Sequence, residues 1–204
     1  MIAEARAKGY LVSYNHPDWS LQSYPDYIGL EGVTAVEVYN TGCVVSGWVL
    51  DEGDHVLDSF LKAGKRVYPV ATDDNHNERH MCGGWVRFKA PALTYDNIMN
   101  AYEQGDFYAS WGPELEALYL EDGILKVDMP ADSHVVCVEV HTFARWAGRV
   151  CGEDLTHAEI DLGVLLNETR KSAYPLDRAY FRVVLTDDKG NRALTRGYFF
   201  DELE

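Results

Sequence analysis

The hydrophobic pattern of the chain changes near Pro113, and this change constrains the fold more than any other feature. Before Pro113, short apolar runs alternate with segments whose apolar side chains share one helical face, as in residues 55–63. After Pro113 the helical period is lost. Short runs such as residues 180–185 alternate apolar and polar side chains, which is typical of strands with one buried face. The chain therefore combines a mixed strand and helix pattern with a pattern of strands joined by turns.

The two patterns predict two domains of different fold class. In the first part, the strand-like runs are residues 11–14, 35–39 and 66–71, and the helical segments are residues 55–63 and 94–105. Strands that alternate with helices pair in parallel and are covered by those helices, which predicts an α/β domain over residues 1–113. In the second part, the strand-like segments are residues 115–127, 135–143 and 180–200. They predict a small antiparallel β-sandwich over residues 114–204.

Charge and composition exclude several classes of protein. The chain of 204 residues carries 18 Lys and Arg against 33 Asp and Glu, and its net charge of −15 would repel nucleic acid. Hydrophobic residues make up 47% of the chain, too many for a disordered acidic segment. No run of about 18 apolar residues is present, and residues 1–10 lack the apolar centre of a signal peptide. We therefore expect no membrane partner, a cytoplasmic location and four free cysteine thiols.

Polar residues follow each strand-like run of the first part. These segments are residues 15–17, 37–40 and 72–76. Because the carboxyl ends of parallel strands share one edge of a sheet, where α/β proteins bind ligands, we expect the segments to meet. In an extended chain Asp74 and His76 point the same way. A carboxylate oxygen beside an imidazole nitrogen suits a first-row divalent metal, and His16 is the candidate third ligand.

Three further residues have both a functional and a structural interpretation. His80, beyond His76, is expected in a solvated loop rather than in a metal site. The guanidinium group of Arg79 could bind a phosphate through two hydrogen bonds, and a surface ion pair is the simpler role. Trp19 could stack on a ligand ring or pack beneath a loop. The sequence leaves these alternatives open.

Four motifs follow one another in a fixed order. They are N-H-P-x-W from Asn15, V-E-V-Y-N from Val36, A-T-D-D-N-H from Ala71 and G-D-F-Y-A-S-W-G-P from Gly105. In this order they resemble the PHP family of polymerase and histidinol phosphatase domains. The set is most similar to the stand-alone phosphoesterase-like members, which carry a β-sandwich after the barrel. The resemblance covers nearly the whole chain.

The resemblance implies a fold, an activity and a set of site residues. The family has a distorted (β/α)7 barrel, in which up to three metals at the strand ends hydrolyse phosphate esters with metal-activated water. This chain would hold about three of the β/α units, a partial barrel over residues 1–113. The residues that match metal ligands, for Zn, Mn or Fe, are His16, Asp74 and His76. Weaker candidates for contacts with a small phosphorylated substrate are Glu37, Asn40 and Arg79.

The chain departs from the family pattern at the first metal ligands. The family opens with a His-x-His strand, whereas this chain has no His-x-His and no histidine before His16. We therefore expect an incomplete site, with metal bound substoichiometrically or not at all, in a phosphoesterase homologue that is inactive as this chain alone. The alternative hypothesis is a non-catalytic, degenerate scaffold that acts as a binding or assembly module.

The missing half of the barrel also predicts a partner. Without it, the apolar strand that begins at Leu11 would form an unpaired sheet edge, and such an edge favours pairing with another chain. We expect this edge to be covered in a homo-oligomer or by a complementary fragment that carries the N-terminal half of the barrel.

Overall fold

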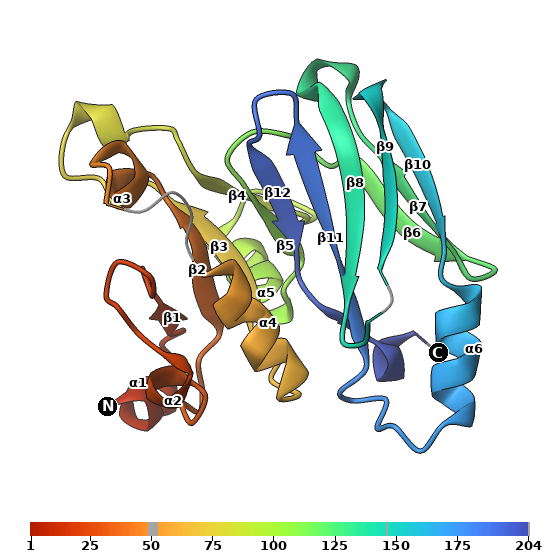
Figure 1. Ribbon diagram of the computed structural model, residues 1–204. Coiled ribbons are helices and arrows are strands. Elements are labelled where there is room, and N and C mark those ends of the chain that lie inside the picture. The colour runs from red at the N-terminus through yellow and green to blue at the C-terminus, as the bar shows by residue number, and fades with distance from the viewer. Residues whose placement is uncertain (49–52, 146, 204) are drawn as a thin grey trace. The chain divides into compact units, whose positions relative to one another are not determined.

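The computed structural model describes residues 1–48, 53–145 and 147–203 (Figure 1). It divides the chain into two compact units, Met1–Trp111 and Gly112–Glu204. Over the described residues the structure is rich in strands, 13 in number, and its longest helix has 10 residues. No helix in these ranges is long and apolar enough to cross a membrane.

In the first unit, three strands form a parallel sheet. They are β1 (Ser13–Tyr14), β2 (Ala35–Asn40) and β3 (Tyr68–Thr72), in the order β1-β2-β3. The helices around them are α1 (Ile2–Ala7), α2 (Tyr24–Tyr27), α3 (Thr41–Val45) and α4 (Asp54–Lys62). The parallel pairing predicted from the alternating segments is present in these strands.

Helix α4 supplies a large part of the apolar core of the first unit. Its fully buried residues are Val56, Leu57, Phe60 and Leu61, and it packs against β2, the central strand. Burying one such side chain contributes roughly 1.5–3 kcal/mol, so this face fixes the helix on the sheet. The helix predicted at residues 55–63 is confirmed. The chain turns away at Gly64, where φ is +79°, a conformation that favours glycine.

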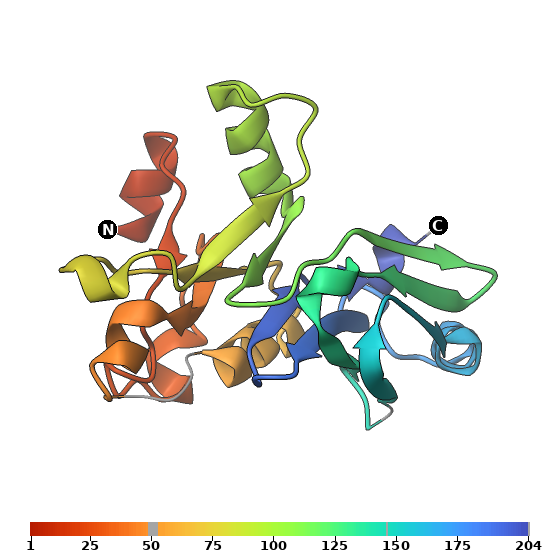
Figure 2. The same ribbon diagram turned by 90° about the horizontal axis from the view of Figure 1, so that it is seen from above.

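A second pair of strands in this unit runs antiparallel. Strands β4 (Trp85–Phe88) and β5 (Phe107–Ser110) are joined by helix α5 (Tyr95–Gln104). The Thr94 hydroxyl oxygen accepts the Asn97 backbone N–H at 3.4 Å and caps α5, as the sequence predicts. Figures 1 and 2 show α4 and α5 on opposite faces of the β1–β3 sheet.

The partial (β/α)7 barrel predicted for residues 1–113 is wrong. A barrel requires each helix to return the chain to another parallel strand. After β3 the chain instead passes the short 3-10 turn η1 (Glu78–His80) and enters the antiparallel β4–β5 pair, and β1 has only 2 residues. Strand β4 was not predicted because it has 4 residues and is only partly buried, which leaves a weak hydrophobic pattern in the sequence.

The second unit contains two groups of antiparallel strands. One has the order β12-β11-β8-β9, with β13 also paired to β11, and the other has the order β10-β7-β6. The strands are β6 (Ala117–Glu121), β7 (Ile124–Asp128), β8 (Val135–Thr142), β9 (Gly148–Leu155), β10 (His157–Asp161), β11 (Tyr180–Asp187), β12 (Arg192–Thr195) and β13 (Tyr198–Phe199). The remaining segments are α6 (Gly163–Lys171), η2 (Ala131–Ser133) and η3 (Phe200–Glu202). The hairpins predicted at residues 115–127 and 180–200 are confirmed.

Strand β11 lies at the centre of the second unit. Its alternating pattern predicts one buried face, with Phe181, Val183 and Leu185 inside. These residues are buried, but Arg182 and Val184 on the other face are also buried, at 0% exposure each. The strand is therefore enclosed on both faces. The alternation of polar and apolar residues in its sequence does not mark a face exposed to solvent.

The expectation of four free thiols is wrong for one pair. Cys137 on β8 and Cys151 on β9 lie directly opposite each other and form a disulfide. Cys43 and Cys82 keep reduced thiols. Cross-strand register brings the bonded pair together, and neither the spacing of the cysteines nor the composition of the chain reveals that register.

Candidate functional site

The buried carboxylate of Glu37, on β2, joins three segments of the first unit. Its Oε2 accepts the backbone N–H of His16 at 2.6 Å and the side-chain amide of Asn40 at 3.1 Å. The hydroxyl of Thr72, at the end of β3, donates to Oε1. Glu37 is 2% exposed, and these donors compensate the carboxylate for its lost hydration. The polar segments that follow β1, β2 and β3 therefore meet at this side chain.

Asn40 extends the same network toward the loop after β3. Its Oδ1 accepts the backbone N–H of Cys43 at 2.9 Å and so caps helix α3. Its Nδ2 donates to Glu37 and, at 3.2 Å, to Oδ2 of Asp74. Asn40 is fully buried. The structure thus places Glu37 and Asn40, the weaker predicted substrate contacts, inside the scaffold of the site.

Asp74 and His76 lie close together, but their backbone conformation differs from the predicted one. The prediction assumed an extended chain, but Asp74 has a φ of +45°. The pair nevertheless meets, because Nδ1 of His76 lies 2.7 Å from the Asp74 carbonyl oxygen and 3.7 Å from Asp74 Oδ1. With the Nδ1 proton donated to the carbonyl, the lone pair of His76 is on Nε2. A carbonyl partner of this kind commonly orients metal-ligating histidines.

His16, the third predicted ligand, is held by its own turn. It follows β1 with a φ of +34°, and its Nδ1 lies 2.8 Å from the hydroxyl of Ser20. Its ring meets the indole of Trp19 edge-on, with 5.1 Å between the ring centroids. Together with the bond from its backbone N–H to Glu37, these contacts fix the imidazole at the end of β1.

Two of the three predicted ligands, Asp74 and His76, are placed to share a metal ion. His16 does not complete a set of three with them. The side chains of Asp74 and His76 are 37% and 71% exposed, and together they offer an oxygen and a nitrogen to solvent. His16 is linked to them through Glu37 and Asn40. Within the part of the chain that the structure describes, no group of three His, Cys, Asp or Glu side chains is arranged to hold a metal ion.

Asp73 anchors the loop behind the site. Its carboxylate accepts the backbone N–H groups of Cys82, Gly83 and Gly84 at 2.7, 2.9 and 3.1 Å, and the Thr41 hydroxyl at 3.2 Å. Partial burial opposes ionisation, but these hydrogen bonds outweigh it and lower the pKa of Asp73. A Cβ at Gly83 would lie 2.4 Å from the Thr41 side chain, so the approach requires glycine. This anchor was not predicted, because its only signal in the sequence is the Gly83-Gly84 pair that begins ten residues after Asp73.

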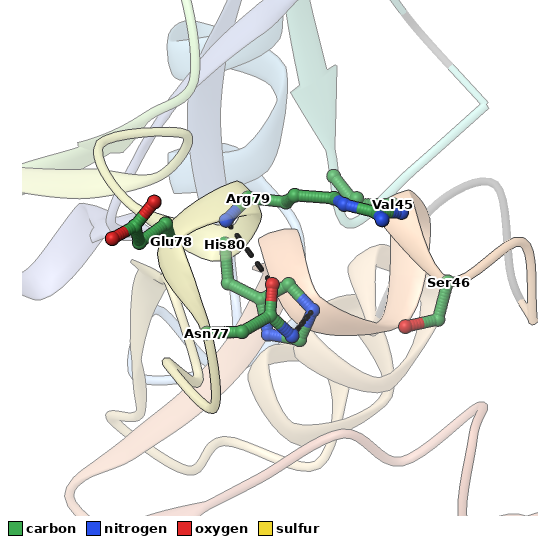
Figure 3. A pocket seen from close by; sticks show the side chains of 6 residues that line it. All are labelled: Val45, Ser46, Asn77, Glu78, Arg79 and His80. Carbon is green, nitrogen blue, oxygen red and sulfur yellow. Dashed lines mark hydrogen bonds between the residues drawn. The ribbon is translucent and has the colours of Figure 1, made fainter.

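A cavity of about 540 Å³ lies between the end of α3 and the loop that contains η1 (Figure 3). Its lining residues are Val45, Ser46, Asn77, Glu78, Arg79 and His80. His80 is 8% exposed, so the expectation of a solvated loop histidine is wrong. The cavity is polar, and it adjoins the Asp74 segment because His80 Nδ1 lies 3.3 Å from the Asp74 carbonyl oxygen.

Asn77 links the ring of His80 to the backbone of η1. Its Oδ1 accepts the backbone N–H of Arg79 at 3.1 Å, which leaves Nδ2 to donate to His80 Nε2 at 3.0 Å. On the other side of the ring, His80 Nδ1 lies 3.3 Å from the Asp74 carbonyl oxygen and 3.4 Å from the backbone nitrogen of His76, so both ring nitrogens are engaged. Figure 3 shows the Arg79 side chain extending toward α3. Arg79 is therefore the cationic side chain that lines this cavity, whereas His80 has a structural role.

Comparison with known proteins gave no match. Neither a family model nor a curated protein nor a solved structure matches this chain. The resemblance to PHP phosphoesterases therefore depends on the ordered sequence motifs alone.

Proposed function

We propose that the chain is a homologue of metal-dependent phosphoesterases that carries part of a divalent-metal site at the ends of β1, β2 and β3. The observation that carries the proposal is the hydrogen-bonded network centred on Glu37, which ties His16 to Asn40 and through it to Asp74. It collects the residues of three separate motifs at one edge of the sheet, where α/β proteins bind ligands.

Each residue has a defined part in this proposal. Asp74 and His76 offer an oxygen and a nitrogen to Zn, Mn or Fe, and a bound metal of this kind supplies an activated water and neutralises phosphate charge. Glu37 and Asn40 hold the strand ends in place. Arg79, at the nearby cavity, is suited to two parallel hydrogen bonds with a phosphate group. Two ligands bind a metal weakly, so hydrolysis requires further ligands from another polypeptide.

The alternative is a non-catalytic scaffold that serves as a binding or assembly module. Two observations favour it. The carboxylates of Glu37 and Asp73 are already engaged by backbone and side-chain donors. In addition, the described residues contain no three-ligand group. Under this alternative the polar network only holds the loops together.

Metal content separates the two functions. The purified chain is dialysed against Mn²⁺ or Zn²⁺ and analysed for bound metal, beside Asp74→Asn, His76→Gln and the control His157→Gln in the second unit. The proposal predicts up to about one metal per chain, lost in the first two variants and kept in the control. Equal metal in all four proteins, or none in the wild type, would favour the scaffold.

Hydrolysis and mass test the need for a partner. With Mn²⁺ present, we expect the chain alone to hydrolyse 4-nitrophenyl phosphate at the background rate. Turnover that depends on both Mn²⁺ and His76 would show that the site is complete and would contradict this part of the proposal. A monomer in light scattering at micromolar concentration would exclude a homo-oligomer as the source of the missing ligands.

A further inference from the structure

Two tryptophans form an exposed aromatic pair beside His16. The ring centroids of Trp19 and Trp48 are 5.8 Å apart, and the ring planes are tilted by 38°. Trp19 is 46% exposed and Trp48 is 63% exposed. Because the rings are tilted rather than parallel, the indoles do not cover each other, and each leaves aromatic surface open to solvent.

Short turns fix the backbone at both tryptophans. Trp19 lies in a turn closed by the bond from the Ser20 N–H to the His16 carbonyl, at 3.0 Å. Trp48 follows α3, and its N–H donates to the Cys43 carbonyl at 3.1 Å. Because Asn40 caps α3, the position of Trp48 is tied to the same network as the strand ends. The backbone at both tryptophans is therefore fixed before a ligand binds, which lowers the ordering cost of binding.

The His16 imidazole is a polar group in direct contact with the pair. Its ring meets Trp19 at an interplanar angle of 81°, and Ser20 holds its Nδ1. An imidazole beside an open indole face is a complementary environment for a planar ring that carries an anionic group. The ring would stack on the indoles, and the anion would lie next to His16.

We propose that Trp19 and Trp48 form a subsite for the planar ring of an aryl phosphate ester. The inference rests on the proposed function for the phosphate group, and it adds the substrate class, an ester of an aromatic alcohol. Stacking of a flat ring on an aromatic side chain contributes enough affinity for the loss of one indole to be measurable.

The experiment uses the full chain freed of metal by a chelator, so that it does not depend on the metal site. Saturation-transfer NMR measures the binding of phenyl phosphate and, as a non-aromatic phosphate of comparable charge, glucose 1-phosphate. The variants are Trp48→Ala and Trp48→Phe. Tyr95→Ala is the matched control, because Tyr95 is an aromatic residue on helix α5 and is 79% exposed. Light scattering of each variant records its oligomeric state.

We expect phenyl phosphate to bind and glucose 1-phosphate to bind less tightly. Trp48→Ala should weaken phenyl phosphate binding about tenfold, whereas Trp48→Phe should remain within about threefold of the wild type. Tyr95→Ala should have no effect. If the metal site failed its own test while this pattern held, the ring subsite would stand without the phosphoesterase function.

Several results would overturn the subsite. Absence of phenyl phosphate binding to the wild type at millimolar concentration would reject the proposal. Equal effects of Trp48→Ala and Tyr95→Ala would also reject it. Equal binding of the two phosphates would show that the indoles do not select a ring. A change of oligomeric state in Trp48→Ala, with phenyl phosphate binding unchanged, would assign the indoles to a contact between copies of the chain.

Discussion

The two units of the protein bury polar groups for different purposes. In the first unit, buried Glu37 and Asn40 lie at strand ends and tie loops to one another. In the second unit, buried Asp187 accepts the backbone N–H groups of Lys189 and Asn191 and so closes a hairpin turn. Burying an uncompensated polar group is costly in either place. Buried Glu37 and Asn40 join separate loops, whereas buried Asp187 closes a single turn, and this contrast is the reason for proposing a ligand site in the first unit.

The largest expected effect is on the apolar core of the second unit. Phe181 is 2% exposed and stacks on Tyr198, so Phe181→Ala should lower the free energy of unfolding by about 3–5 kcal/mol. Urea denaturation measures the loss, and Tyr119→Ala, at a side chain that is 44% exposed, is the control. Hydrogen exchange should show the lost protection in the second unit. Unchanged protection of the second unit would contradict a core that depends on Phe181.

The disulfide should give the next largest effect. It joins Cys137 to Cys151, which are 14 residues apart, and a loop of this length stabilises by about 3 kcal/mol. Urea unfolding with and without a reductant measures the difference, and Cys82→Ser is the control because Cys82 is a free thiol. We expect the second unit to lose this stability. An unchanged urea midpoint after reduction would show that the bond does not constrain the unfolded chain.

A smaller effect is expected at the polar network of the first unit. Asn40→Ala removes the cap of α3 and the donor to Glu37 and Asp74, and should cost about 2 kcal/mol. Asn100→Ala, at an exposed position of α5, is the matched control. Hydrogen exchange should locate the change at residues 37–48 and 72–76. A loss no larger than that of the control would show that the network does not stabilise the strand ends.

The smallest effect is a pH dependence confined to the second unit. Nδ1 of His157 lies 2.5 Å from Asp128, and this hydrogen bond raises the pKa of His157 above its ordinary value of 6.5. The stabilisation is fully present below pH 6.5 and is lost as the pH rises through the raised pKa of the folded state. Thermal unfolding of His157→Gln should vary less with pH between about 6 and 9. The same slope in the variant and the wild type would contradict this assignment.

The sequence predicted the elements whose signals are local. Helix α4 is specified by its apolar face, α5 by Thr94 and Gly105 at its ends, and the meeting of the strand ends by parallel pairing. These signals depend on neighbouring residues, and they survive in the folded chain because each agrees with the packing around it.

The features that escaped prediction depend on contacts between distant segments. The return of the chain through β4, the opposition of Cys137 and Cys151 and the left-handed turn at Asp74 all depend on long-range register or loop closure. The same limit applies to the metal site. Residue types and spacing identify Asp74 and His76 as a pair, but only the fold determines whether a third ligand reaches them.

Paramagnetic broadening by Mn²⁺ tests the central claim most directly, because it compares the two units in one NMR experiment. The account predicts that small additions of Mn²⁺ first broaden the amide signals of residues 72–78 and those near His16, and that His76→Gln abolishes this broadening. The histidine–carboxylate pairs of the second unit, His134 with Asp154 and His157 with Asp128, serve as the internal comparison. Broadening that begins at those pairs, or that is unchanged in His76→Gln, would contradict a metal site at the ends of β1, β2 and β3.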